Sequence, residues 1–306
     1  MRVLITGGAG FIGSHVADAF VALGHEVLVV DNLSTGHREN VPSAAEFVEI
    51  DLADDGLADV FERFRPEVVD HFAAQASVKV STTNAIFDLT VNGGGTARIA
   101  ELCSRFGVRK MIYASTGGAL YGNPEIWPVT EEHPIKPLSP YGLSKRVGEL
   151  YIDFYRRQSG LNATILRYAN AFGPRQDPNG EAGVVAIFSG QLLRGAPCTI
   201  DGDGEQKKDY VYVADIARAN VLALHHGDGE AFNIGTGRGT SVNAIFQTLK
   251  AVTGSKADAR YGPPRPGDVR DIWLEYAKAK QGLGWEPTVS FEEGLRQTVE
   301  AMRAAG

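Results

Sequence analysis

Cysteine is scarce in this sequence: Cys103 and Cys198 are the only two among 306 residues. Two cysteines cannot form a disulfide framework, and their number is typical of a protein from a reducing compartment. No apolar run approaches the roughly 20 residues that span a bilayer. The N-terminal residues also lack the charged flank and cleavage site of a signal peptide. We therefore expect a cytoplasmic protein without a membrane partner.

An excess of positive charge is missing as well. The chain has 30 Lys and Arg against 37 Asp and Glu, a net charge of −7 at pH 7, and its basic residues are scattered. Nucleic-acid binding requires a basic face, so no such partner is expected, and no metal site is predicted. Hydrophobic residues make up 43% of the chain, which is ample for a packed core. Because the length exceeds the usual limit of a single core, we expect two lobes.

The first 31 residues have the pattern of a βαβ unit. An apolar strand at 2–5 is followed by TGGAGFIG at 6–13, a helical pattern as far as Leu23, and a buried strand at 26–30. The glycines at 7, 10 and 13 stand where the backbone turns tightly and approaches a pyrophosphate at a helix N-terminus. Asp31 follows about 20 residues later, where its carboxylate accepts from a ribose 2′-OH and repels a 2′-phosphate. The unit predicts bound NAD rather than NADP.

Strands and helices continue to alternate up to residue 168. We predict strands at 46–51, 67–72, 110–114 and 164–168, with helices at 57–64, 86–106 (interrupted by three glycines at 93–95) and from 140 onward. This order predicts a doubly wound parallel sheet, a Rossmann NAD-binding domain over residues 1–173. The segments after Gly173 are shorter and mixed, so a smaller α/β substrate domain is predicted over 174–306. Part of 209–240 is expected to pack back on the first domain.

The segment SPYGLSK at 139–145 predicts a helix that carries an acid–base pair. Ser139 is a favourable N-cap, and Pro140 suits the first helical position. Tyr141 and Lys145 then lie one turn apart on the same face. A phenol titrates near pH 10, and a neighbouring ammonium lowers that pKa, so the pair can supply a phenolate base. The opposite face is predicted to be buried, through Val147, Leu150, Tyr151 and Phe154.

Five motifs in order carry a resemblance to a known family: TGGAGFIGSH (6–15), STGGALYG (115–122), SPYGLSK (139–145), RYANAFGP (167–174) and RPGD (265–268). They resemble those of the extended short-chain dehydrogenase/reductases. Within these the chain is similar to the nucleotide-sugar epimerases, above all those that interconvert UDP-glucose and UDP-galactose. The resemblance covers essentially the whole chain, and it is specific for the superfamily but much less so for the sugar.

The resemblance implies a catalytic cycle and a set of roles. NAD is reduced and reoxidised within one turnover, through a 4-keto sugar. Tyr141 takes the proton of the sugar 4-OH, and Lys145 binds the nicotinamide ribose and lowers the Tyr141 pKa. The implied NAD contacts are Gly7, Gly10, Phe11, Ile12, Gly13, Asp31, Asn32, Asp51, Leu52, Phe72, Ala73, Ala74, Asn92, Ala114, Tyr141, Lys145 and Tyr168.

The substrate contacts implied by the same resemblance are Gln75, Asn170, Lys208, Tyr210, Arg265 and Asp268. Related enzymes usually have an arginine where this chain has Lys208. A lysine binds phosphate as a point charge, without the bidentate fork of arginine. A homodimer through the helices around 86–106 and 147–157 is also implied.

The chain departs from the family at the hydroxyl that shares the substrate proton. In the better-known epimerases, a Ser or Thr stands four residues before the tyrosine of the YG pair. Here that tyrosine is Tyr121, and Gly117 stands four residues before it. We expect Thr116 to supply the hydroxyl and Ser115 to face the cofactor. The alternative is that both cap the strand end and leave proton transfer to Tyr141 alone.

Several other functions compete with this interpretation. A 4-epimerase for a UDP-uronic acid or a UDP-N-acetylhexosamine stays open, because the sequence does not place the residues around the sugar. A 4,6-dehydratase needs an acid pair directly after the active-site threonine, where this chain has Gly117 and Gly118, and a reductase is disfavoured as well. A non-catalytic NAD-binding regulator would be expected to lack Tyr141 or Lys145, and both are present.

Overall fold

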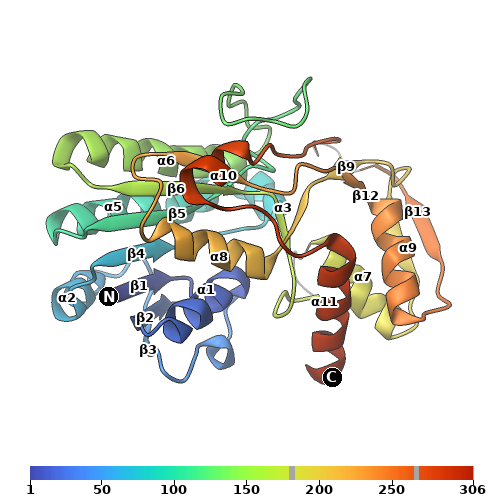
Figure 1. Ribbon diagram of the computed structural model, residues 1–306, viewed down its shortest axis with the longest axis horizontal. Coiled ribbons are helices and arrows are strands. Elements are labelled where there is room, and N and C mark those ends of the chain that lie inside the picture. Colours follow the sequence, from blue (N-terminus) through green and yellow to red (C-terminus); the bar gives the residue numbers. More distant parts are fainter. Residues whose placement is uncertain (179–182, 265–268, 306) are drawn as a thin grey trace.

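A seven-stranded parallel sheet forms the larger lobe of the molecule (Figure 1). The computed structural model describes residues 1–178, 183–264 and 269–305. The order of the strands is β11-β6-β5-β4-β1-β2-β3. Their bounds are β1 Arg2–Thr6, β2 Glu26–Asp31, β3 Glu46–Glu49, β4 Val68–His71, β5 Lys110–Thr116, β6 Ala163–Tyr168 and β11 Ala231–Ile234. Near-continuous apolar runs such as VLIT in β1 suit strands that are covered on both faces.

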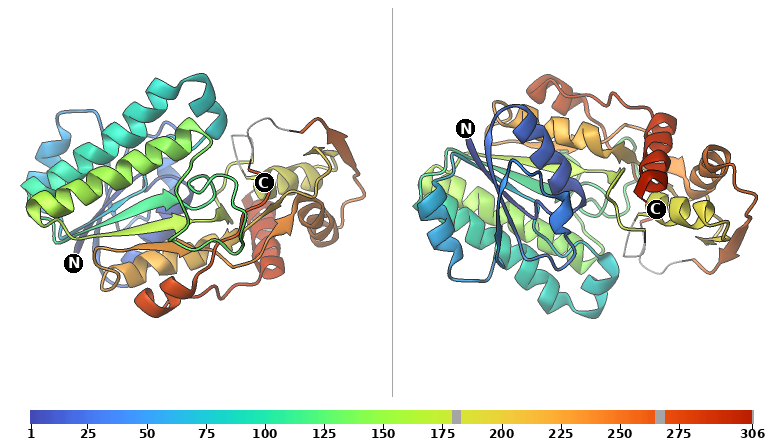
Figure 2. Two further views of the ribbon diagram at one scale, coloured as in Figure 1. Left: turned by 90° about the horizontal axis from the view of Figure 1, so that it is seen from above. Right: turned by 90° about the horizontal axis from the view of Figure 1, so that it is seen from below.

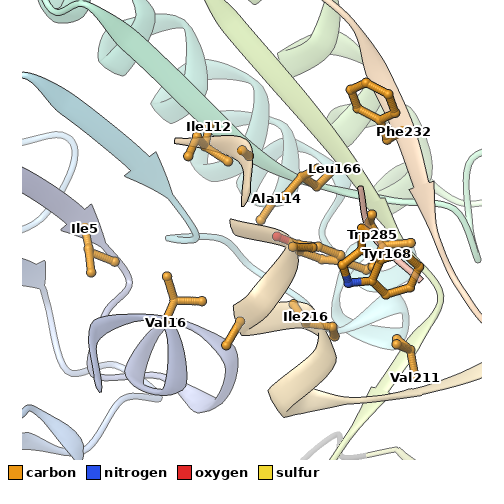
Figure 3. Packing of buried hydrophobic residues seen from close by; sticks show 14 of the residues in the cluster. Ile5, Val16, Ile112, Ala114, Leu166, Tyr168, Val211, Ile216, Phe232 and Trp285 are labelled. Carbon is orange, nitrogen blue, oxygen red and sulfur yellow. The ribbon is translucent and has the colours of Figure 1, made fainter. Parts of the chain in front are cut away.

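Helices cover both faces of this sheet, as Figure 2 shows from above and below. One face packs against α1 (Phe11–Ala22), α8 (Val213–Ala223) and α10 (Ala277–Leu283). Figure 3 shows part of this core, with Ile5, Ile112 and Leu166 of the sheet near Val16 and Ile216 of the helices. The other face packs against α2 (Leu57–Phe64), α5 (Gly95–Arg105) and α6 (Pro140–Ser159). The predicted doubly wound fold is therefore confirmed.

The helix predicted over 86–106 is divided into three parts. It consists of α4 (Ala85–Leu89), a π-helical turn η2 (Thr90–Gly94) and α5, and it is preceded by α3 (Val78–Thr83), which the sequence did not predict. A Cβ on Gly93 would lie 3.0 Å from Val147 Cγ1, and one on Gly95 would lie 2.8 Å from Leu52 Cδ1. These two glycines therefore let the chain approach α6 and Leu52 closely. A π-turn is frequent near functional sites.

A smaller mixed lobe lies beside the carboxyl ends of the sheet strands, at the right of Figure 1. It has its own apolar cluster, formed mainly by α7 (Val184–Leu193), α9 (Val242–Thr253) and α11 (Phe291–Ala305). Pairs of short strands complete it: β7 (Asn170–Phe172) with β10 (Tyr210–Tyr212), β8 (Cys198–Asp201) with β13 (Ala259–Gly262), and β9 (Lys207–Lys208) with β12 (Thr240–Ser241). A 3-10 turn, η1 (Arg38–Asn40), lies in the larger lobe. The predicted second, smaller α/β domain is confirmed.

One prediction about α6 is wrong for the single chain. Leu150, Tyr151 and Phe154 were expected to be buried, but they are 50%, 45% and 47% exposed. The helix buries a different stripe, which includes Lys145, Glu149 and Ile152. The spacing of these residues predicted an apolar face on α6, but it did not predict whether other segments of the same chain pack against that face. None of the helices within the described residues is long and apolar enough to cross a bilayer.

Candidate active site

The glycine-rich turn between β1 and α1 leaves its backbone accessible to a ligand. Gly7 has a φ of +70°, and a Cβ on Gly13 would lie 2.3 Å from the Gly7 carbonyl oxygen. Helix α1 can approach the turn this closely only with glycine at 13. Gly10 is the N-cap, and no side chain caps the first turn, so backbone N–H groups can bind an anion there. The predicted cofactor residues in this turn are Gly7, Gly10, Phe11, Ile12 and Gly13.

The carboxyl ends of β2 and β3 bring together a second group of predicted cofactor residues. Asp31 accepts hydrogen bonds from the backbone N–H groups of Ala9 (3.0 Å) and Leu33 (2.9 Å), which fix its carboxylate beside the glycine turn. Asn32 donates from Nδ2 to Asp51 Oδ2 at 2.6 Å. A carboxylate at this position can accept a hydrogen bond from a ribose hydroxyl.

The residues after β4 continue the same edge of the sheet. Ala73 donates its N–H to the Thr6 carbonyl at 3.1 Å, and Ala74 follows half-buried. The Phe72 ring stacks on Tyr168, with centroids 6.5 Å apart and planes 4° apart. Tyr168 was predicted to contact the cofactor, but its hydroxyl donates to the buried Asn220 at 3.0 Å, and its ring lies among the core residues in Figure 3. The Tyr168 side chain therefore belongs to the core, where its ring packs against that of Phe72.

Tyr141, Lys145 and Thr116 meet where β5 ends and α6 begins. Ser139 caps α6 by accepting from Gly142 N–H at 3.1 Å, as its position predicts. The hydroxyl of Thr116 lies near that of Tyr141 and favours its ionised form. Lys145 Nζ donates to the Ala114 carbonyl at 2.9 Å. The three predicted groups are thus brought together, and all of them are mostly or fully buried.

Burial dominates the electrostatics of this pair. The pKa of Tyr141 is raised to about 12, chiefly by burial and also by the charge of Asp88, against a smaller lowering by the Thr116 hydroxyl. Burial lowers the pKa of Lys145 to about 8, against the attraction of Asp88 and Glu149. The sequence predicted that Lys145 would lower the Tyr141 pKa, but in the protein alone burial outweighs any such effect. A further positive charge beside the phenol is needed to lower its pKa.

Ser115 points away from this site, which corrects the expectation that it faces the cofactor. Neighbouring residues on a strand project to opposite faces, and Ser115 Oγ donates to Glu149 Oε1 at 2.7 Å. Glu149 also accepts two hydrogen bonds from Arg167, both at 2.9 Å. Burial alone would raise the pKa of Glu149, but its bonds to Arg167, Ser115 and Arg146 hold that pKa below the usual value. Ser115 is therefore part of a buried ion-pair network.

Gln75, predicted to contact the substrate, uses its side-chain amide in hydrogen bonds within the protein. Its side-chain amide donates to Asp88 Oδ1 (2.7 Å) and to the Ser77 carbonyl (2.9 Å), and it accepts from Ser77 N–H (2.5 Å). Asn92, predicted to bind the cofactor, donates to Asp88 Oδ1 at 3.1 Å and to Ser144 Oγ at 3.0 Å. Gln75 and Asn92 thus join the loop after β4 to α6. Within the described residues, the buried Asp88 Oδ2 has no hydrogen-bond partner.

The predicted substrate residues on the short strands β7, β9 and β10 have contacts of their own. Asn170 donates from Nδ2 to the Asp209 carbonyl at 3.0 Å, and Lys208 Nζ donates to the Val269 carbonyl. Tyr210 was predicted to bind substrate, but it is 7% exposed and packs on Phe291 with ring centroids 5.9 Å apart. Its ring therefore belongs to the core of the small lobe. The predicted Arg265 and Asp268 lie outside the described residues.

Comparisons with known proteins agree with this geometry. The NAD dependent epimerase/dehydratase family matches residues 3–235. The chain belongs to this family. The crystal structure of UDP-glucose 4-epimerase from Thermotoga maritima, with UDP-glucose, is 52% identical, with a TM-score of 0.98 over 100% of this chain and 99% of that one. The Thermus thermophilus UDP-glucose 4-epimerase complex with NAD is 46% identical, with a TM-score of 0.96 over 100% of both chains. UDP-glucose 4-epimerase from Mycolicibacterium smegmatis is 45% identical over 99% of each chain.

This member of the epimerase/dehydratase family has site residues that the sequence did not single out. Asp88 and Glu149 are buried carboxylates whose negative charges raise the pKa of Lys145. Glu149 stands four residues after Lys145 on the same helical face, a signal that was available in the sequence. Asp209 accepts hydrogen bonds from Thr236 Oγ1 (2.5 Å) and Leu274 N–H (3.1 Å). No local pattern reveals those contacts, because their partners are distant in the sequence.

Proposed function

We propose that the protein is an NAD-dependent UDP-glucose 4-epimerase, an isomerase that interconverts UDP-glucose and UDP-galactose. The observation that carries this proposal is the meeting of the Tyr141 and Thr116 hydroxyls where β5 ends and α6 begins, with the buried Lys145 one turn further along α6. Three relatives with 45–52% identity over nearly the whole chain are UDP-glucose 4-epimerases, which supports this substrate over the alternatives.

The NAD site would be formed by the glycine turn, Asp31 and the loop after β4. The fit rests on two structural observations. A Cβ at 7 would lie 2.5 Å from Ala73 N and one at 13 would lie 2.3 Å from the Gly7 carbonyl oxygen, so only glycines allow this tight turn, and the first turn of α1 has no side-chain cap. When bound, NAD would supply the acceptor for a hydride from C4 of the sugar and a positive charge that favours the Tyr141 phenolate. Asp31 would select NAD, because its carboxylate repels a 2′-phosphate.

The protein's own side chains would transfer one proton in each turnover. Tyr141 would take it from the sugar 4-OH and hold it on the phenolic oxygen until C4 is reduced again. Thr116 would hydrogen-bond the same reacting oxygen, and Lys145 would orient the nicotinamide ribose. Asp88 and Glu149 oppose the burial that lowers the Lys145 pKa, so they help to keep its ammonium charged near neutral pH. Asn170 and Lys208, with Arg265 and Asp268, are the candidates for binding the UDP portion.

We propose that residues 1–173 form the cofactor domain and residues 174–306 the substrate domain, with β7 at the end of the first range packing in the small lobe. The pairing of β11 with β6 and the packing of α8 on the sheet support the return of part of 209–240 to the first domain. Both cysteines in the chain are buried and free, in line with action in the cytoplasm, where the enzyme would serve galactose metabolism.

We further propose a homodimer through α4 and α6. Exposed apolar side chains lie on these two helices, where Ile86 is 75%, Phe87 48% and Tyr151 45% exposed. Large exposed apolar patches are typical of interaction sites, and a second copy of the same surface would cover them.

Product ratios from a panel of sugar nucleotides test the activity. The protein is expected to convert UDP-galactose and UDP-glucose into one equilibrium mixture, faster than it acts on UDP-glucuronate, UDP-N-acetylglucosamine, dTDP-glucose or GDP-mannose. Tyr141→Phe should abolish turnover while bound NAD is retained, because the phenyl ring packs alike but accepts no proton. Preferred turnover of another sugar, or full activity of Tyr141→Phe, would refute the proposal.

A further inference from the structure

Leu274 occupies the space in which a side chain at position 117 would lie. A Cβ built on Gly117 would be 2.4 Å from Leu274 Cδ1 and 3.1 Å from its Cδ2. A Cβ on Gly235, on another side of Leu274, would lie 3.0 Å from Leu274 Cβ. The Leu274 side chain therefore packs against two glycines, Gly117 and Gly235, and Leu274 is only 1% exposed.

Neither backbone can move aside without losing hydrogen bonds. Gly117 donates its N–H to the Tyr168 carbonyl at 2.8 Å, which continues the pairing of β5 with β6. Leu274 donates its N–H to Asp209 Oδ2 at 3.1 Å. On the two sides of Leu274, Val129 donates to the Trp273 carbonyl and accepts from Glu275 N–H, both at 2.8 Å. The overlap at 117 is therefore with the end of the Leu274 side chain, whose backbone is held in place, and a Cβ there would also lie 3.3 Å from the Arg167 carbonyl oxygen.

The neighbouring glycine differs. The nearest atoms to a Cβ on Gly118 are those of the Asn170 amide, at 3.9 Å, and Thr116 Oγ1, at 4.0 Å, which are ordinary contact distances. A side chain therefore fits at position 118 but not at position 117, although both residues are glycine. The constraint belongs to position 117 and its partner Leu274, and not to the loop as a whole.

We propose that Leu274 is a positioning residue that assigns the hydroxyl of the site to Thr116, because it excludes any side chain from position 117. This inference rests on the proposed epimerase function for its catalytic part. Thr116 Oγ1 accepts from Ala119 N–H at 3.2 Å and lies near the Tyr141 hydroxyl, so it already stands where the reacting oxygen needs a partner. The small lobe, through Leu274, thereby determines which residue of β5 takes part in proton transfer.

A double-mutant cycle on thermal stability tests the steric part without any assay of activity. Gly117→Ala should lower the Tm by roughly 2–10 °C, since overpacking a rigid core is destabilising. The matched control Gly118→Ala should change it much less. Leu274→Ala is itself less stable because it leaves a cavity. In that background, Gly117→Ala should lower the Tm by less than half as much as it does in the wild type. Equal costs in both backgrounds, or no cost in the wild type, would overturn the proposal.

Reduction of bound NAD in a single turnover tests the catalytic part. Thr116→Val is expected to slow this step about 10- to 150-fold. Adding Gly117→Ser together with Leu274→Ala should restore at least part of the rate, because a hydroxyl then fits at 117. If the cycle behaves as expected and the rate is not restored, the assignment of the hydroxyl by Leu274 is refuted. If the wild type itself does not reduce NAD with any UDP-hexose, the proposed function fails, while the stability cycle still decides the steric part.

Discussion

At the scale of single residues, neighbours on β5 have different tasks. Thr116 faces Tyr141, whereas Ser115 faces the Glu149–Arg167 ion pair on the other side of the strand. The alternation of side chains along a strand explains why only one of two adjacent hydroxyls can reach the site. A sequence motif that contains both residues does not tell them apart.

Replacing each hydroxyl should separate catalysis from stability. Thr116→Val should lower kcat about 10- to 150-fold with little change in Tm, because it removes one hydrogen bond to a reacting oxygen. Ser115→Ala should cost about 1–3 kcal/mol of stability, since it removes a donor from a buried carboxylate, and it should slow the reaction far less. Steady-state kinetics and urea unfolding of both variants provide the measurements. A larger loss of kcat in Ser115→Ala would reverse the roles.

Asp70 gives a second prediction at this scale. It is fully buried on the sheet face of α1 and α8, and neither of its carboxylate oxygens has a hydrogen-bond partner within the described residues. Burial raises the Asp70 pKa well above its usual value. The folded protein therefore binds a proton that the unfolded chain releases above about pH 4, so this carboxyl lowers stability as the pH rises towards its folded pKa.

Asp70→Leu should raise the free energy of unfolding by about 1–3 kcal/mol at pH 7, since an apolar side chain suits that face of the core. The gain should be smaller at pH 4, where the carboxyl is neutral in the folded state and about half protonated in the unfolded chain. Urea unfolding at the two pH values measures the difference. A variant that is less stable than the wild type at pH 7 would mean that Asp70 has a partner that compensates for its burial.

At the scale of elements, α6 connects the core to the chemistry. Its N-cap fixes the start of the helix next to β5, and its buried stripe carries Lys145 and Glu149 on successive turns. The same kind of cap begins α9 in the small lobe, where Ser241 Oγ accepts from Ala244 N–H at 3.2 Å. The two caps are chemically alike, but only the first lies within one turn of Tyr141.

The two caps provide a matched pair of variants. Ser139→Ala and Ser241→Ala should each cost about 1 kcal/mol of stability, the usual effect of losing an N-cap. Only Ser139→Ala should also lower kcat, because fraying of the first turn displaces Tyr141. Unfolding and kinetics measured in parallel make the comparison. An equal fall in kcat in both variants would show that activity follows global stability instead.

The sequence was sufficient for the features that depend on local pattern. The glycine turn, the cap at Ser139 and the spacing of Tyr141 and Lys145 are short-range signals, and the structure has the predicted helix start and parallel strands. The contacts of Gly117 with Leu274 and of Ser115 with Glu149 join segments far apart in the chain, and no periodicity encodes them. Burial also raised the Tyr141 pKa, an effect that spacing alone cannot reveal.

At the scale of the whole molecule, the exposed face of α6 predicts assembly. The wild type should sediment as a dimer at micromolar concentration, because apolar side chains on α4 and α6 are left uncovered in the single chain. Leu150→Arg with Phe154→Arg should shift it to a monomer, since unpaired charges would be buried in the interface. Leu23→Arg, at a residue 56% exposed at the end of α1, is the control. A monomeric wild type would refute the proposed dimer.

The route of the chain through the sheet has a consequence for synthesis. The face covered by α1 is completed by α8 and α10, and Trp285, fully buried there, donates from Nε1 to the Asp215 carbonyl at 2.8 Å. The edge strand β11 is likewise made long after β6, its neighbour. While the ribosome is still translating, the first strands therefore have an open apolar face, and we expect them to depend on chaperones until the region around Trp285 has emerged.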